Sequence, residues 1–197
     1  LIRLIAQSTT YQLSSRYDGE WKDTYVTYFA RKLVRRLDAE ELHDAIVKAT
    51  GVGVSYTVQG LPEPARWAMQ LPDTTEQRGV GVLNLFGRGN RDNIARSSEG
   101  SILQGLTLLN DNFVISRVRA SAVNSAAPNL VRRLLSGGLG NNQIVDEMYL
   151  TFLGRLPSDA ERATAEDFLT KSPTPAARLL ALEDLTWALI NKLEFAF

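Results

Sequence analysis

The chain has 197 residues, of which 44% are hydrophobic, and its 22 Lys and Arg residues balance its 22 Asp and Glu residues. It holds no Cys, which excludes disulfides, thiol catalysis, iron–sulfur clusters and thiolate zinc sites, and its one His excludes a multi-histidine metal site. The composition is typical of a globular domain, and no apolar run reaches the roughly 20 residues that a membrane-spanning helix needs.

The zero net charge is unevenly distributed along the chain. Residues 1–77 carry 9 basic and 10 acidic side chains, residues 78–135 carry 8 and 3, and residues 136–197 carry 5 and 9. All eight basic residues of the middle segment are Arg. The positive middle and the negative tail either complement each other within the domain or give its surface two faces of opposite sign.

The first half of the chain contains one well-marked helix. Residues 1–13 resemble the end of a helix, and because the chain starts there without Met, we expect it to be a C-terminal fragment of a longer protein. Asp38 and Glu41 have the spacing of a capping box, and an apolar stripe follows as far as Gly51, so a helix is predicted between them. His43 lies off that stripe, which predicts a solvated or capping side chain; a functional histidine is the alternative.

Residues 51–100 form a region rich in loops. Four apolar residues alternate with small or polar ones between Val52 and Val58, which predicts a short strand, a hairpin or an extended loop. Three prolines interrupt the stretch that follows. The glycines at positions 79–89 lack the order of a phosphate-binding loop, so we interpret them as turn residues.

The second half is predicted to be helical. Apolar residues recur at helical spacing in six stretches, at residues 102–109, 114–122, 130–135, 144–153, from 158 onward and 174–190. Ser158 and Glu161 form a capping box, and Thr174 is a cap followed by Pro175 at the first helical position. Short connections between the helices predict an all-α, irregular multi-helix bundle, with residues 1–197 as a single domain.

The densest polar segment, residues 86–101, is an arginine-rich loop that leads into a predicted helix. Arg88, Arg91 and Arg96 are the candidate anion-binding residues, because guanidinium groups bind carboxylate, sulfate and phosphate. Asp92 and Glu99 belong to the same candidate site. The alternative is structural, with these two acids pairing with the arginines; a role for either as general acid or base is a weaker interpretation.

Other classes of site find less support in the sequence. Arg35-Arg36 and Arg132-Arg133 are basic pairs, but no aromatic platform accompanies them and the chain is neutral, so we expect no nucleic-acid partner. We predict no catalytic residue, metal or cofactor for this chain.

Five stretches resemble one family: residues 4–16 with STTYQLSSR, residues 35–46 with RRLDAEELHDAI, the loop from 86 running into LLNDNFV at 108–114, LGRLP at 153–157 with Glu161, and LEDLTWALINKLEF at 182–195. Together they resemble the C-terminal domain of unknown function, family 1553, of large planctomycete-type bacterial proteins. The resemblance implies an exported protein, periplasmic or extracellular, with upstream domains that often include a cytochrome-c-like haem domain. Many relatives carry cysteines in the loop corresponding to residues 94–96, and this chain does not.

The expected function is therefore that of a helical interaction or structural module of a larger exported bacterial protein, with its upstream domains, one of them haem-carrying, as partners and with no activity of its own. The alternative is part of an enzyme or binding protein for anionic polymers such as polysaccharides, with the arginine-rich loop holding negative groups.

Overall fold

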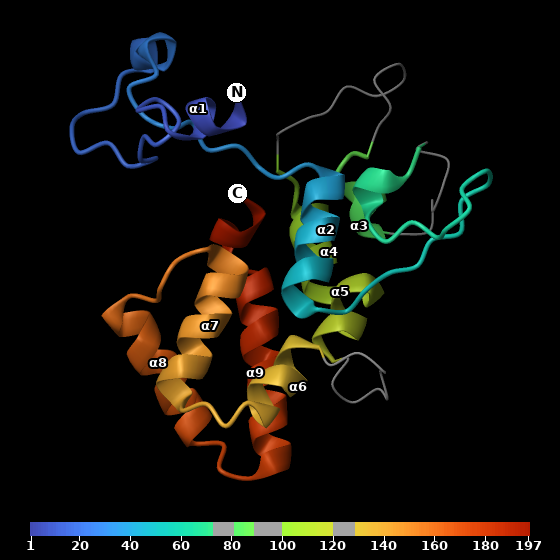
Figure 1. The fold of residues 1–197 in the computed structure, drawn as a ribbon. Coiled ribbons are helices and arrows are strands. Elements are labelled where there is room, and N and C mark those ends of the chain that lie inside the picture. The colour runs from blue at the N-terminus through green and yellow to red at the C-terminus, as the bar shows by residue number, and fades with distance from the viewer. Residues whose placement is uncertain (73–80, 89–99, 120–128) are drawn as a thin grey trace. The chain divides into compact units, whose positions relative to one another are not determined.

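A computed structural model describes residues 1–72, 81–88, 100–119 and 129–197 (Figure 1). Helices are the only regular secondary structure among these residues, which confirms the predicted all-α class. None of the helices in the described ranges is long and apolar enough to cross a membrane. The chain divides into two compact units, one of residues 1–36 with Phe197 and one of residues 37–196. The expectation of a single domain stays a prediction.

The first unit contains two short helices and an aromatic cluster. Helix α1 is Ile2–Ala6 and the 3-10 helix η1 is Asp23–Tyr28; neither contains a buried residue. The predicted first helix therefore ends earlier than position 13. Tyr17, Trp21 and Tyr25 lie with ring centroids 5.5–5.8 Å apart, and the Arg31 guanidinium lies 3.9 Å from the centroid of Trp21.

Helix α2, Ala39–Thr50, begins and ends where the sequence predicts. The backbone N–H of Asp38 donates to Glu41 Oε2 at 2.9 Å, as in a capping box. Gly51 ends the helix in the left-handed conformation, with φ of 72°, which glycine adopts at little cost. Leu42 and Ile46 of α2 are fully buried and form part of the core.

In the described residues of the loop-rich region there is one isolated antiparallel bridge, where the sequence predicts a short strand, a hairpin or an extended loop. Tyr56 and Ala65 exchange two backbone hydrogen bonds of 2.9 Å. Pro62 and Pro64 lie within this turn and have no N–H to extend the ladder. Two short helices follow in the described residues: the 3-10 helix η2, Ala68–Gln70, and α3, Gly81–Leu85.

The second half is helical, as predicted, and side-chain caps begin most of its helices. Ser101, Asp111, Asn129, Ser158 and Thr174 each accept a backbone N–H of the helix that they precede. The α-helices are α4 Ile102–Asn110, α5 Asn112–Val118, α6 Leu130–Ser136, α7 Asn141–Leu153, α8 Asp159–Thr170 and α9 Pro175–Ile190, and the 3-10 helix η4 Leu193–Ala196 follows.

The apolar stripe predicted for α4 does not face the core. Ile102 and Leu103 are 84% and 62% exposed, whereas Thr107 and Leu108 are buried. Helix α4 is short and mostly apolar, so its sequence pattern does not distinguish the face that packs against α3 and α5. The predicted extension of the next helix to position 122 lies partly outside the described residues.

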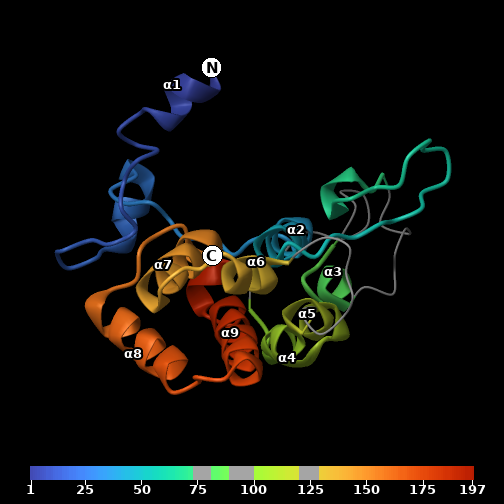
Figure 2. The same cartoon turned by 60° about the horizontal axis from the view of Figure 1, so that its bottom comes forward.

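The core of the second unit lies where α7, α8 and α9 pack together and where α9 meets α5 and α6 (Figure 2). Helix α2 packs against α5 and α6 and extends the core to α3. The largest fully buried side chains come from these helices: Leu42, Ile46, Leu83, Ile144, Met148, Leu169, Leu182 and Ile190.

Leu182 provides a test of this core. Truncation of its fully buried side chain in Leu182→Ala leaves a cavity, so we expect the free energy of unfolding to fall by about 2–5 kcal/mol. Leu180→Ala, at a position 52% exposed on the same helix, should change it by no more than about 0.5 kcal/mol. Urea unfolding measures both, and equal losses would contradict the assigned face of α9.

Candidate functional site

A solvent-open cavity of about 890 Å³ lies along α8 and α9 and extends to α5; we call it the α8–α9 groove. Its lining is mostly apolar or small: Ile115, Tyr149, Ala160, Thr164, Ala165, Phe168, Leu185, Trp187, Ala188 and Leu189, with Arg119, Glu161, Asp184 and Lys192 as the charged members. A mostly apolar cavity with a few charged groups is typical of binding sites in proteins.

Two aromatic side chains contribute large apolar surfaces to the groove. Phe168 of α8 is 41% exposed. Trp187 of α9 is half-buried, and its Nε1–H donates to the carbonyl oxygen of Leu109 at 3.1 Å. The polar atom of the indole is therefore satisfied inside the protein. The groove thus exposes apolar surface that the intramolecular packing leaves uncovered.

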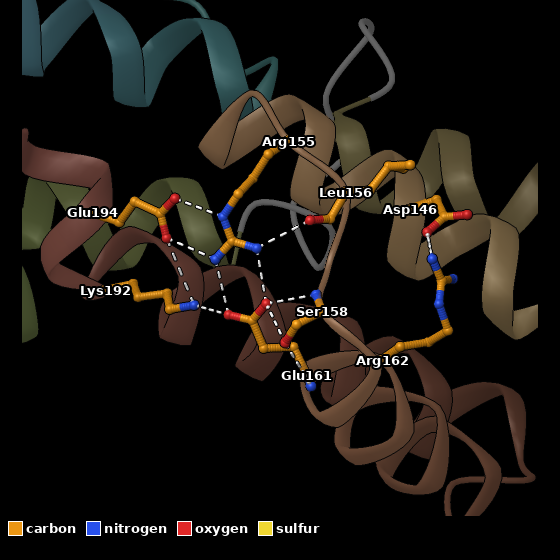
Figure 3. Close-up of polar contacts among 8 residues, drawn as sticks. All are labelled: Asp146, Arg155, Leu156, Ser158, Glu161, Arg162, Lys192 and Glu194. Atoms are coloured by element: carbon orange, nitrogen blue, oxygen red, sulfur yellow. Dashed lines mark hydrogen bonds and ion pairs between the residues drawn. The ribbon is translucent and has the colours of Figure 1, made fainter. Parts of the chain in front are cut away.

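A network of charged side chains lies at one end of the groove (Figure 3). The Arg155 guanidinium donates to Glu161 at 2.8 and 2.9 Å and to Glu194 at 2.6 and 2.8 Å. The Lys192 ammonium donates to Glu161 and lies 3.8 Å from Glu194. Arg155 follows α7, Glu161 is in the first turn of α8, and Lys192 and Glu194 follow α9. The network therefore fixes the ends of three helices relative to one another.

The network shifts the pKa of both carboxyl groups in the direction expected for ion pairs. Hydrogen bonds from Arg155, and then from Lys192, hold the pKa of Glu161 well below its usual range. Hydrogen bonding to Arg155 also lowers the pKa of Glu194. Burial is the main cause of the raised pKa of Tyr149, whose ring lies 5.6 Å from Lys192 Nζ. At neutral pH the carboxyl groups of Glu161 and Glu194 are therefore charged and the hydroxyl of Tyr149 is neutral. Neither carboxyl group carries a proton to donate at that pH.

A second set of ion pairs lies at the α5 side of the groove. Arg119 donates to the buried carboxylate of Glu183 at 3.1 Å and to Asp184 at 2.8 Å. The hydrogen bond with Glu183 is the main cause of the raised pKa of Arg119. The groove is thus apolar in the middle and has charges of both signs, paired with each other, at its margins.

The structure corrects the prediction that His43 is solvated: its side chain is fully buried. His43 Nδ1 lies 2.7 Å from Asp44 Oδ1, and Nε2 lies 2.7 Å from the hydroxyl of Tyr56. The carboxylate can only accept, so Nδ1–H donates to Asp44; in the neutral imidazole Nε2 then accepts from the Tyr56 hydroxyl. The ring also stacks on Phe113, with centroids 4.5 Å apart. His43 is therefore part of a hydrogen-bonded chain within the core.

The same chain holds the loop-rich region against α2. Asp44 also accepts the backbone N–H groups of Ala68 and Met69, at 2.7 and 3.2 Å. Tyr56 carries the isolated bridge to Ala65. One pair of adjacent α2 side chains thus fixes both η2 and the bridged turn.

A smaller cavity of about 430 Å³ lies beside Tyr56; we call it the polar cavity. It is lined by residues of the loop-rich region, of the first position of α3 and of α5 with its cap: Val54, Ser55, Tyr56, Gly81, Asp111, Asn112, Phe113, Ser116 and Arg117. Burial lowers the pKa of Arg117 to about 10.

Of the candidate anion-binding residues, Arg88 alone lies within the described ranges. Its side chain is buried, and Nε lies 3.9 Å from Glu40 Oε1 on α2. Arg91, Asp92, Arg96 and Glu99 lie outside the described residues. The anion-binding role of the arginine-rich loop stays a prediction. In the described part of the chain, no group of three or more His, Asp or Glu side chains is arranged to hold a metal ion.

The residues of the groove and of the polar cavity were not singled out as a site by the sequence pattern. Glu161 is recognisable as a capping residue, and its hydrogen bond to the Ser158 N–H confirms that role. Its partners Arg155 and Lys192 lie in stretches that carry the family resemblance, but no local pattern predicts their ion pairs with Glu161. Tyr56 and Arg117 come from segments 61 positions apart and are brought together by the fold alone.

Glu161→Gln tests the charged network, because Gln preserves the capping hydrogen bond and removes the charge. The pKa of Glu161 is lower in the folded chain than its ordinary value of 4.5, so its ion pairs stabilise the fold above that pH and lose their contribution as pH falls below it. We expect the variant to be less stable by about 1 kcal/mol at pH 7, because the pairs are partly exposed, and the difference to shrink towards pH 3. Urea unfolding across this pH range measures it; a difference independent of pH would contradict the network's role.

Tyr56→Phe tests the buried hydrogen-bonded chain. The variant leaves His43 Nε2 buried without its partner, so we expect the free energy of unfolding to fall by about 1–3 kcal/mol. Tyr28→Phe, at a position 78% exposed, is the matched control and should change stability by no more than about 0.5 kcal/mol. Thermal or urea unfolding measures both variants. Equal effects would show that the His43–Tyr56 bond does not stabilise the fold.

Comparison with known proteins places the chain in a family without assigning an activity. Searches of curated proteins and of solved structures find no match. Residues 1–169 match the family PSD1, described as protein of unknown function DUF1553. The matched part includes α1 to nearly the end of α8, and α9 follows it. This confirms the resemblance found in the sequence: the chain belongs to the DUF1553 family of proteins of unknown function.

Proposed function

We propose that this chain is a helical interaction module whose α8–α9 groove binds an amphipathic helix of a protein partner. The observation that carries the proposal is the groove itself, a cavity of about 890 Å³ whose lining is mostly apolar and open to solvent. Covering such a surface releases about 25 cal/mol for each Å² of apolar area removed from water. A partner that supplies apolar side chains is therefore the occupant that gains most.

The arrangement of α8 and α9 favours a helix as the occupant. The two helices are joined by the short connection 171–174 and lie antiparallel, side by side (Figure 2). A third helix can lie along such a pair and place apolar residues at i, i+3, i+4 and i+7 between them. Phe168 and Trp187 are the aromatic anchors that the structure offers to those residues.

The charges of the groove support a neutral rather than an ionic ligand. Lys192 is paired with Glu161 at one end, and Arg119 is paired with Asp184 at the other. Charges already paired do not select an anion or a cation, but they can bond the polar flanks of an amphipathic helix. Arg88 of the arginine-rich loop is buried beside Glu40, so the groove and not this loop is the basis of the proposal.

The setting that we propose for this module is a larger exported bacterial protein, periplasmic or extracellular. The family resemblance in the sequence supports that setting. It also supports the upstream domains of the same polypeptide, including one that carries haem, as the source of the bound helix.

Ala188→Arg tests the groove without removing a packed side chain, because Ala188 is an exposed residue of the lining. Amphipathic helical peptides displayed on phage would be selected on the chain and their affinities measured by calorimetry. We expect selected peptides to carry apolar residues at helical spacing and to bind Ala188→Arg at least about tenfold more weakly, because the guanidinium places a charge in the apolar contact.

The matched control is Ala163→Arg, which adds the same side chain at an exposed position of α8 outside the groove. It should bind the selected peptides like the unaltered chain. No enrichment of helical peptides would overturn the proposal, and so would equal loss of binding in both variants. Self-association of the chain that Ala188→Arg abolishes would also overturn it, by showing that a second copy occupies the groove.

A further inference from the structure

The polar cavity beside Tyr56 contains a guanidinium whose hydrogen-bonding capacity is largely unused. Arg117 Nη1 donates to the carbonyl oxygen of Phe113 at 2.8 Å, and its Cζ lies 3.6 Å from the centroid of the Phe113 ring. Its Nε is buried and has no hydrogen-bond partner among the residues that the structure describes. Within the described residues, no carboxylate forms an ion pair with Arg117. A guanidinium has five N–H donors, and among the described residues the one acceptor that Arg117 reaches is the Phe113 carbonyl oxygen.

In the absence of a ligand, burial of the Arg117 charge lowers the stability of the fold. Burial penalises its charge and lowers its pKa to about 10, while the nearby Asp111 and Tyr56 offset only part of that penalty. A half-buried cation that the described residues leave without a paired anion lowers stability, and a group with a perturbed pKa in a cavity is a candidate for ligand binding. An anion bound in the polar cavity would form the ion pair with Arg117 that no carboxylate of the described residues forms.

The other polar groups of the cavity restrict what that anion is. The Asp111 carboxylate caps α5 by accepting the Phe113 N–H at 2.8 Å, and its other oxygen lies directly against Gly81, where a Cβ would collide with it. This fixed negative charge disfavours a dianion. It accepts hydrogen bonds from hydroxyl groups, as do the side chains of Ser55 and Ser116.

Tyr56 adds an acceptor to the same wall. When its hydroxyl donates to His43 Nε2 in the neutral imidazole, a lone pair of its oxygen can accept from a ligand. The ring of Phe113 lies between the Arg117 guanidinium and the stacked His43 imidazole, so it holds the guanidinium in place at the cavity. The cavity therefore combines one planar cationic donor with several acceptors and small hydroxyl groups.

We propose that the polar cavity binds a small monoanionic carboxylate that carries hydroxyl groups. Arg117 would bind the carboxylate through its planar donor fork, and Asp111 and Tyr56 would accept from the hydroxyls. The volume of about 430 Å³ lies in the range of small-molecule sites. This site is separate in residues from the α8–α9 groove and does not depend on its occupant.

The experiment uses D-gluconate as the probe, with sorbitol as its neutral analogue and inorganic phosphate as the anion without the carboxylate. Binding to the whole chain is followed by NMR chemical shifts of the amides around Arg117. We expect gluconate to bind at least about tenfold more tightly than sorbitol or phosphate. Arg117→Met should abolish that preference, because Met preserves apolar packing on Phe113 but has no donor.

Stability separates a binding role from a structural one. Because no carboxylate in the described part of the chain pairs with Arg117, Arg117→Met should unfold at the same temperature or higher. Arg133→Met, at an exposed position of α6, and Ala188→Arg in the groove should both retain gluconate binding. Equal binding of gluconate and sorbitol, tighter binding of phosphate, or retained gluconate binding in Arg117→Met would each overturn the proposal. A loss of stability in Arg117→Met would overturn it as well, by assigning the guanidinium to the fold.

Discussion

The polar contact that joins the ends of three helices in the second unit is the pairing of the Arg155 guanidinium with two carboxylates. One planar group bonds Glu161 at the start of α8 and Glu194 after α9, and Lys192 closes the set. The apolar cores of α7, α8 and α9 explain why these helices pack, but apolar contacts alone permit sliding and rotation. Directional hydrogen bonds join the start of α8 to the segment after α9, and Glu161 and Lys192 of this network line the groove.

A second constraint of the same kind organises the loop-rich region. His43 and Asp44 are adjacent on α2, and between them they bond the Tyr56 hydroxyl and two backbone N–H groups of η2. A segment with one isolated bridge has little regular backbone pairing of its own, so these side chains determine its position. The polar cavity is a consequence, since the segment brings Tyr56 opposite Arg117. The two cavities thus arise from two independent polar networks on one helical scaffold.

Local signals in the sequence predicted the helices well, and long-range contacts explain the failures. The capping residues Asp38 and Ser158 act within one turn, so their spacing is sufficient to locate a helix start. The prediction that His43 is solvated was wrong because its hydrogen-bond partner Tyr56 lies 13 positions away, across a loop with no regular pattern. Arg155 and Glu194 are 39 positions apart, and although both lie in stretches that resemble the family, no local pattern predicts that they pair. The predicted buried face of α4 was wrong because a short helix that is apolar on most sides has no single apolar face.

The central claim, that α8 and α9 form a docking groove for a helix, is tested most directly by amide hydrogen exchange of the chain with and without a selected helical peptide. The account predicts slowed exchange in residues 159–190, around the groove, and unchanged exchange in α2 at residues 39–50. Protection confined to α2 or to the first unit, with none in α8 and α9, would contradict the account.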